Sequence, residues 1–171
     1  MRRFAAVVLI VSLIGFAAGC GSSGSTAGSG SSQTQQVHFA KTKFLLHAGL
    51  AFGAFHRYIY KPFKSGAYRS AGHFRKALIL AKGALAALFI YHEAKLAAKD
   101  AQADPLLRKL VAPLTALSDK AKALGSGLRG NQADTQVAAA NSDVSSISAQ
   151  SANAGKPIQD VTPPANLQPV Q

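Results

Sequence analysis

Residues 77–91 place the strongest constraint on the fold, because they are apolar on nearly every face of a helix. They read ALILAKGALAALFIY, and only Lys82 and Gly83 interrupt the apolar run. A helix that is apolar all round has to be covered by a protein core or by lipid. β-Branched residues are sparse beyond the first 15 positions, which favours helices over strands. We therefore expect an all-α fold.

Two long helices flank a predicted turn and form an antiparallel hairpin. The first candidate helix spans residues 37–61 and the second spans residues 69–101. The residues that break the apolar pattern between them are Pro62, Ser65 and Gly66. With further helices downstream, this hairpin extends to a small three- or four-helix bundle.

Small residues indicate where the two hairpin helices approach each other most closely. Gly49 and Gly53 are small residues four positions apart on one face of the first helix. The second helix offers Ala77, Ala81 and Ala84. We expect these two helices to form the tightest pair in the bundle.

A third helix has a clear start signal and an amphipathic pattern. Asp104 is a candidate N-cap, and Pro105 suits the first helical turn. Pro113 should kink this helix, and Gly125-Ser126-Gly127 should end it. Its apolar residues alternate at spacings of three and four and predict one buried seam: Leu107, Leu110, Leu114, Leu117, Ala121 and Leu124.

Residues 131–153 predict a weaker fourth helix, either loosely packed or partly disordered. Asp134 is its candidate cap, and apolar residues recur at three and four among many Ser and Asn side chains: Val137, Ala140, Val144 and Ile147. Residues 154–171 carry four of the seven Pro residues and few bulky apolar ones. We expect them to form a disordered tail.

The N-terminus has the pattern of an export signal. Arg2 and Arg3 precede the apolar segment 4–16, which is too short for a lasting transmembrane helix, and small residues 17–19 then lead to Cys20. This segment resembles the signal peptide of bacterial lipoproteins, over residues 1–20 only. The resemblance implies cleavage before Cys20, attachment of diacylglycerol to its sulfur, and anchoring to the outer face of a bacterial membrane in the cell envelope.

Two other outcomes for this N-terminus stay open. Ala17 stands where Leu is usual in lipoproteins, and Ala17 with Gly19 also fits ordinary cleavage after Gly19. An uncleaved membrane anchor is the other outcome. Cys20 is the only Cys, so an exported form has no internal disulfide. The expected organisation is a signal peptide (1–19), the lipidated Cys with a flexible Gly/Ser linker (20–36), a helical domain (37–153) and the tail (154–171).

The predicted turn is rich in cations. The formal net charge is +12, and residues 37–92 contain nine Lys or Arg residues and no acid. Six of the nine lie in the turn, interleaved with aromatic residues: Arg57, Lys61, Lys64, Arg69, Arg75 and Lys76. The simplest interpretation is a solvated basic turn whose aromatic residues close the bundle. The alternative, in an exported protein, is contact with anionic lipid headgroups or cell-wall polymers. We expect no nucleic-acid partner.

The histidines suggest metal ligation only weakly. A hairpin that folds about residue 65 would set His56 opposite His73, and His38 opposite His92. A metal site normally needs three or four ligands, and no other ligand accompanies either pair. We therefore expect no metal and no cofactor, with a His-based metal or haem carrier as an alternative.

Catalytic patterns are missing from the sequence. No acid precedes Glu93, and the chain has no GxSxG turn and no glycine-rich phosphate loop before a helix. The sequence thus predicts a non-enzymatic envelope lipoprotein. A membrane-inserted hairpin, with residues 44–60 and 77–91 in the bilayer, is the other alternative. The oligomeric state does not follow from the sequence.

Overall fold

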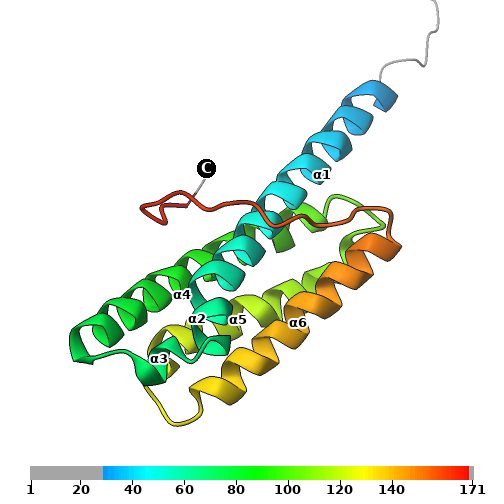
Figure 1. The fold of residues 1–171 in the computed structure, drawn as a ribbon. Coiled ribbons are helices and arrows are strands. Elements are labelled where there is room, and N and C mark those ends of the chain that lie inside the picture. The colour runs from blue at the N-terminus through cyan, green and yellow to red at the C-terminus, as the bar shows by residue number, and fades with distance from the viewer. Residues whose placement is uncertain (1–28, 170–171) are drawn as a thin grey trace, which may run out of the picture.

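The computed structural model describes residues 29–169, with side chains from residue 35, and residues 29–169 contain helices and no strand (Figure 1). The predicted all-α bundle is confirmed. The predicted signal peptide, Cys20 and the linker as far as residue 28 lie outside the described residues, as do residues 170 and 171. The long helices are α1 (Ser29–Ala54), α4 (His73–Ala101), α5 (Val111–Gly127) and α6 (Ala133–Asn153). The short elements are the π-helix η1 (Phe55–Tyr60), α2 (Lys61–Lys64), α3 (Ala67–Ser70) and the 3₁₀-helix η2 (Arg108–Leu110).

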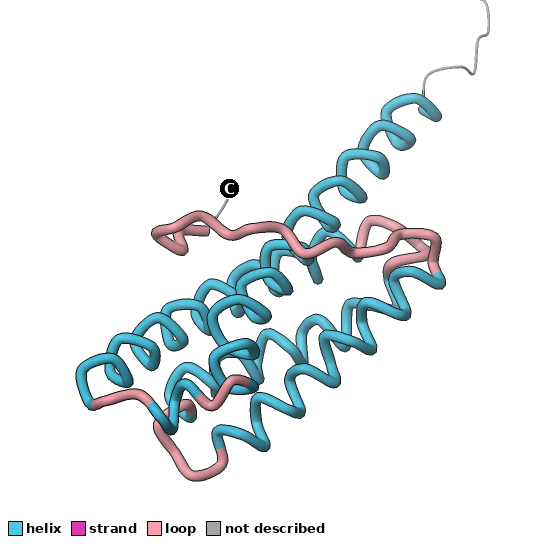
Figure 2. The backbone as a smooth tube through the Cα atoms, viewed as in Figure 1, coloured by secondary structure: helices cyan, strands magenta, loops and turns pink. Residues whose placement is uncertain are grey.

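Successive long helices run antiparallel, and α4 contacts both α1 and α5, while α6 packs on α5 (Figure 1). Short loops join α4, α5 and α6, whereas the C-terminal residues leave α6 and run across α1 (Figure 2). The contact of α4 with α5 is more extensive than its contact with α1. The predicted first helix also includes η1, which contacts α4 as well, so α4 packs about as extensively on the first helix as on the third.

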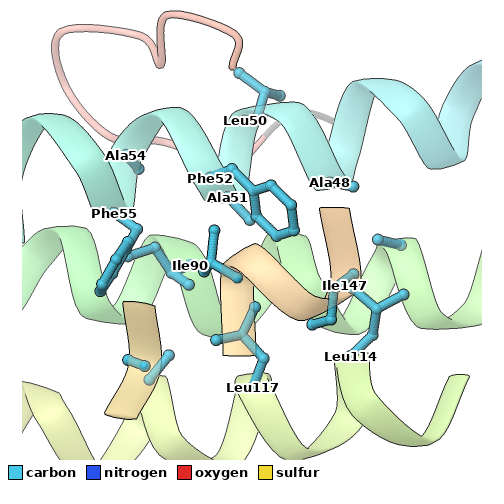
Figure 3. Packing of buried hydrophobic residues seen from close by; sticks show 14 of the residues in the cluster. Ala48, Leu50, Ala51, Phe52, Ala54, Phe55, Ile90, Leu114, Leu117 and Ile147 are labelled. Carbon is cyan, nitrogen blue, oxygen red and sulfur yellow. The ribbon is translucent and has the colours of Figure 1, made fainter. Parts of the chain in front are cut away.

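The core lies where α1, α4, α5 and α6 converge (Figure 3). Its largest side chains come from α1, η1 and α4 and include Phe44, Phe52, Phe55, Ile59, Phe89 and Ile90. The predicted seam of the third helix is buried along its full length, from Leu107 to Leu124. The four apolar residues predicted to anchor the fourth helix are buried as well, and α6 begins within two residues of the predicted start.

Helix α5 begins later than the sequence predicts. Asp104 does cap backbone groups, since its Oδ1 accepts a hydrogen bond from the Leu106 amide at 2.9 Å. The chain then passes through turns and η2, and α5 starts at Val111. Pro113 consequently lies in the first turn, where a missing N–H leaves no helical hydrogen bond unmade. Pro113 therefore does not interrupt α5, contrary to the predicted kink.

The connection between α1 and α4 is helical where the sequence predicts a break. Pro62 lies near the start of α2 and does not end the helical path. Gly66 supplies the reversal with φ 70°, a conformation that favours glycine. Helix α4 then begins at His73, four residues later than predicted. This longer connection shifts the register of the hairpin.

Helix α1 also differs from the prediction at its start, because it begins at Ser29 and includes residues expected in the linker. Its first turns project beyond the bundle (Figure 1). Adding residues to an existing helix gains one hydrogen bond per residue and avoids the cost of a new nucleus. The helix therefore extends past its apolar face.

Residues 155–169, the C-terminal strap, pack against the bundle, although the sequence predicts a disordered tail there. It is not helical, but the Val161 amide donates a hydrogen bond to the Gly49 carbonyl at 2.9 Å, and Ile158 is buried. The step formed by Gly49 and Gly53 receives this strap rather than α4. Leu50 points toward the strap, away from α5 and α6 (Figure 3). A few apolar residues suffice here because the glycines let the two backbones touch.

Replacing Gly53 by Ala should loosen the strap, because the added Cβ would overlap the carbonyl group of Val161. We expect a loss of about 1–3 kcal/mol of unfolding free energy in urea denaturation, as overpacking typically costs. Hydrogen exchange at the Val161 amide should also accelerate. Gly72→Ala is the matched control, since nothing lies within 4 Å of a Cβ there. Equal unfolding free energies for the two variants would contradict the tight packing of the strap.

Candidate functional site

The structure divides the six predicted turn cations into three groups. Arg57, Lys61 and Lys64 line one pocket beside the strap. Arg69 instead forms an ion pair with Asp134 of α6, with Nη2 2.7 Å from Oδ2. The remaining two, Arg75 and Lys76, are exposed in the first turn of α4. Although residues 37–92 contain no acid, Arg69 thus finds a counter-charge from a later helix.

The pocket has a volume of about 420 Å³ and lies between η1, α2 and the strap. Its helical wall contributes cations and one aromatic ring, and its other wall is strap backbone and side chains. The lining residues are Gly53, His56, Arg57, Tyr60, Lys61, Lys64, Asp160, Val161, Thr162 and Pro163. Segments about 100 residues apart in the sequence thus form a single concave surface.

The π-helical geometry of η1 shapes the helical wall. The Lys61 amide donates to the His56 carbonyl, five residues back, which widens this turn relative to an α-helix. Such π-turns occur frequently at functional sites. The His56 and Tyr60 rings meet edge to face, with centroids 5.9 Å apart, and Lys64 Nζ lies 5.7 Å from the Tyr60 ring. The wider turn therefore presents cations and rings on the same side.

The charges around the pocket are mostly positive. His56 Nδ1–H donates a hydrogen bond to Asp160 Oδ2 at 2.7 Å, and Asp160 is the one carboxylate among the described lining residues. Three permanent cations therefore face one carboxylate that already has a partner. This arrangement suits an anionic group, since Arg and Lys form charge-assisted hydrogen bonds with phosphate and carboxylate oxygens.

Buried aromatic residues hold the turn in place behind the pocket. The Tyr68 hydroxyl donates to the Tyr58 carbonyl at 3.3 Å, and the Tyr68 ring lies 3.8 Å from the Phe63 ring centroid. Burial raises the pKa of Tyr68 to about 12, so its hydroxyl stays protonated as a donor across the physiological range. Tyr68 is thus buried at this end of the bundle and Phe63 packs against the core, whereas Phe74 is 80% exposed.

A second polar cluster is buried between α1 and α4. His47 Nδ1–H donates to Glu93 Oε2 at 2.6 Å, and both side chains are almost fully buried. Burying a charged pair carries a desolvation cost that only good geometry offsets. The pair fixes which residues of the two helices face each other.

Two aspartates extend this cluster toward the end of α4. Asp100 Oδ2 lies 3.9 Å from His47 Nε2, and Asp104 Oδ2 lies 3.5 Å from Lys41 Nζ. Burial raises the pKa of Asp100 above its ordinary value, and the nearby positive charges of His47, Lys43 and Lys99 only partly oppose this shift. Asp100 also lines an open groove of about 910 Å³ along residues 35–43 of α1.

The predicted histidine pairs do not form. His56 bonds Asp160 instead of facing His73. Glu93 of α4 bonds His47 of α1, while its neighbour His92 is exposed. The midpoint between His47 and Glu93 is residue 70, five residues beyond the predicted turn. The helical segments α2 and α3 cause this offset. His38 and His73 are exposed.

Neither a metal centre nor a pair of membrane-spanning helices emerges from the described residues. Within that part of the chain, no group of three or more His, Cys, Asp and Glu side chains is arranged to hold a metal ion. One helix there, α4, is long and apolar enough to cross a membrane by length and composition, and 39% of its most apolar window is buried in the bundle.

Sequence reasoning missed Asp160 and the cluster around His47. Asp160 lies in a segment whose Pro content predicts disorder, and only the glycine step at Gly49 and Gly53 signals that another backbone approaches α1. Glu93 is a stronger signal, because it follows the apolar run 77–91 and a buried acid requires a partner. Comparisons of this chain with protein-family models, curated proteins and solved structures find no match.

The His47–Glu93 pair should be energetically coupled. We expect His47→Ala and Glu93→Ala each to cost about 3–5 kcal/mol of unfolding free energy, as truncating a buried pair does. The double variant should cost about 1–3 kcal/mol less than the sum of the two single costs. Urea denaturation of the four proteins measures this coupling. Strictly additive costs would show that the two side chains act independently.

Proposed function

We propose that this chain is a non-enzymatic protein of the bacterial cell envelope, anchored by lipid on Cys20, whose basic pocket binds phosphate groups. The observation that carries the proposal is the convergence of Arg57, Lys61 and Lys64 on one pocket. Anionic lipid headgroups and phosphate-bearing wall polymers both present this chemistry outside the cytoplasmic membrane. The binding of either places the protein at the envelope surface without a catalytic role.

The N-terminal sequence supports the anchor. Its short apolar segment, the small residues that follow and Cys20 resemble a lipoprotein signal peptide. Each buried methylene of an attached acyl chain adds about 0.8 kcal/mol, so two or three chains anchor far more firmly than one. A thioether on the single Cys would also remove a free reactive thiol from an exported protein.

The pocket chemistry supports phosphate over a neutral ligand. Its guanidinium group can engage two oxygens at once, and two flexible ammonium groups stand one helical turn apart on the same wall. Each basic residue near an anionic surface contributes about 1 kcal/mol at low salt. The exposed position of these side chains makes the interaction sensitive to ionic strength.

Mass spectrometry of the mature protein from bacterial membranes tests the anchor. We expect an N-terminal peptide that begins at Cys20 and carries the mass of diacylglycerol on sulfur. An unmodified Cys20, or a peptide that still contains residues 4–16, would overturn this part of the proposal. The Cys20→Ala variant should lose the modification and appear in the soluble fraction.

Neutralising two pocket lysines should weaken phosphate binding. We expect Lys61→Gln with Lys64→Gln to lower the affinity for anionic vesicles or for a glycerol phosphate polymer by about tenfold or more at low salt, at about 1 kcal/mol per cation. Raising the salt concentration should remove most of the difference. Co-sedimentation with each ligand distinguishes the two sources of phosphate.

A charge-matched variant controls for net charge alone. Arg108→Gln with Lys109→Gln removes the same charge from exposed positions in η2, away from the pocket. It should leave binding nearly unchanged. Equal losses in both double variants would mean that overall charge, and not the pocket, attracts the ligand.

A further inference from the structure

The outer face of α4 carries an apolar stripe that the bundle leaves uncovered. Its side chains are between 48% and 80% exposed, and they follow one another at spacings of four, seven and three. They are Phe74, Leu78, Leu85 and Leu88. The stripe extends from Phe74 to Leu88, about 21 Å of helix. Exposed apolar groups in one line on a helix mark a contact surface.

The bundle topology explains why this face stays open. Helix α4 contacts α1 on one side and α5 on the other, and α6 lies diagonally across from it (Figure 1). The strap covers α1 at Gly49. Helix α4 therefore keeps one face that no neighbour in the described part of the chain covers.

The charges on this face all have one sign. Arg75 and Lys82 lie along one edge of the stripe, and Lys95 and Lys99 continue its line beyond Leu88; all four are exposed. The two acids of α4 do not balance them, because Glu93 is buried against His47 and Asp100 points toward the same ring. An apolar stripe with a cationic border is the pattern of a helix that lies in the interface of an anionic membrane.

We propose that the outer face of α4 docks in the plane of an anionic phospholipid bilayer. Phe74 and the three leucines enter the boundary between headgroups and acyl chains, while the flanking Lys and Arg side chains contact lipid phosphates. The helix lies on the bilayer and does not cross it, because its opposite face forms part of the protein core. A second copy of the chain fits this face less well, since two such faces would oppose cations with cations.

The length of chain between Cys20 and α1 also favours a bilayer as the partner of α4. This argument rests on the proposed lipid anchor. Ser29 lies nine positions after Cys20, so the connection reaches at most about 32 Å. The helical domain therefore stays close to the bilayer surface if Cys20 carries lipid. The docking itself needs only an anionic bilayer and is testable without the anchor.

Single tryptophans report on this docking directly, because the chain contains no Trp. The full chain with Leu88→Trp is mixed with vesicles of phosphatidylcholine, with or without phosphatidylglycerol, that contain brominated acyl chains. We expect fluorescence at least about twofold lower with brominated than with ordinary lipid, in anionic vesicles only. Ala149→Trp, on the exposed face of α6, is the control and should not be quenched. Leu85→Trp provides a second reporter should the first variant fold poorly.

Further variants separate this docking from the proposed function. Quenching at position 88 should persist in Cys20→Ala and in the Lys61→Gln, Lys64→Gln variant, so the docking would stand even if the anchor or the pocket proposal failed. Arg75→Gln with Lys82→Gln should reduce quenching, whereas Arg108→Gln with Lys109→Gln should not.

Three results would overturn the docking. The first is unquenched tryptophan fluorescence from the Leu88→Trp variant when its chains are bound to anionic vesicles. The second is equal quenching of the reporters on α4 and α6, which indicates insertion across the bilayer. The third is a blue shift of the Leu88→Trp fluorescence without lipid that rises with protein concentration and accompanies a dimer in sedimentation equilibrium.

Discussion

The apolar character of α4 on almost every side is the constraint on which the rest of the structure depends. Such a helix is stable in water only when its apolar faces are covered. Helices α1 and α5 cover two of them, where small residues permit close approach. Gly125 of α5, for example, lies against Ala87, with only 3.7 Å between its would-be Cβ and the Ala87 side chain. The other long helices and the strap do not enclose this helix completely, so the excess apolar surface appears on its outer face.

Charge segregation along the sequence determines where polar contacts form. All seven acids follow residue 92, and 19 Lys and Arg residues are spread over the whole chain. Folding therefore brings late acids against early basic groups, as in the pairs His47–Glu93, Arg69–Asp134 and His56–Asp160. These few acids cannot balance the cations. Part of the unbalanced remainder lies at the turn pocket and along α4, which are the two surfaces proposed to meet anions, and the rest includes Arg108 and Lys109 of η2.

Local periodicity allowed much of the fold to be predicted. The seam from Leu107 to Leu124 and the repeat from Val137 to Ile147 follow from helical spacing, because one face of each helix must be buried. The register of the first hairpin could not be predicted in the same way. It depends on how Pro62 is accommodated within a continuing helix and on the buried His47–Glu93 contact, both of which are tertiary effects.

The strap is a second feature that local sequence could not predict, because it is ordered by its contact with α1 and not by its own composition. Its polar, Pro-containing sequence cannot form a core, but Gly49 and Gly53 remove the side chains that would keep it from the α1 backbone. The candidate site likewise depends on the position of the strap. Its cations were visible in the sequence, whereas its shape was not, because the second wall comes from residues 160–163.

The two cationic surfaces differ in the feature that selects a ligand. The turn pocket is concave and offers mainly cationic groups, so it suits a single phosphate group from any source. The outer face of α4 combines charge with apolar side chains that gain stability only when they leave water. A soluble polyanion satisfies the cations of α4 but leaves its leucines exposed, whereas an anionic bilayer satisfies both. The apolar stripe, rather than the charge, is therefore what assigns α4 to a membrane surface.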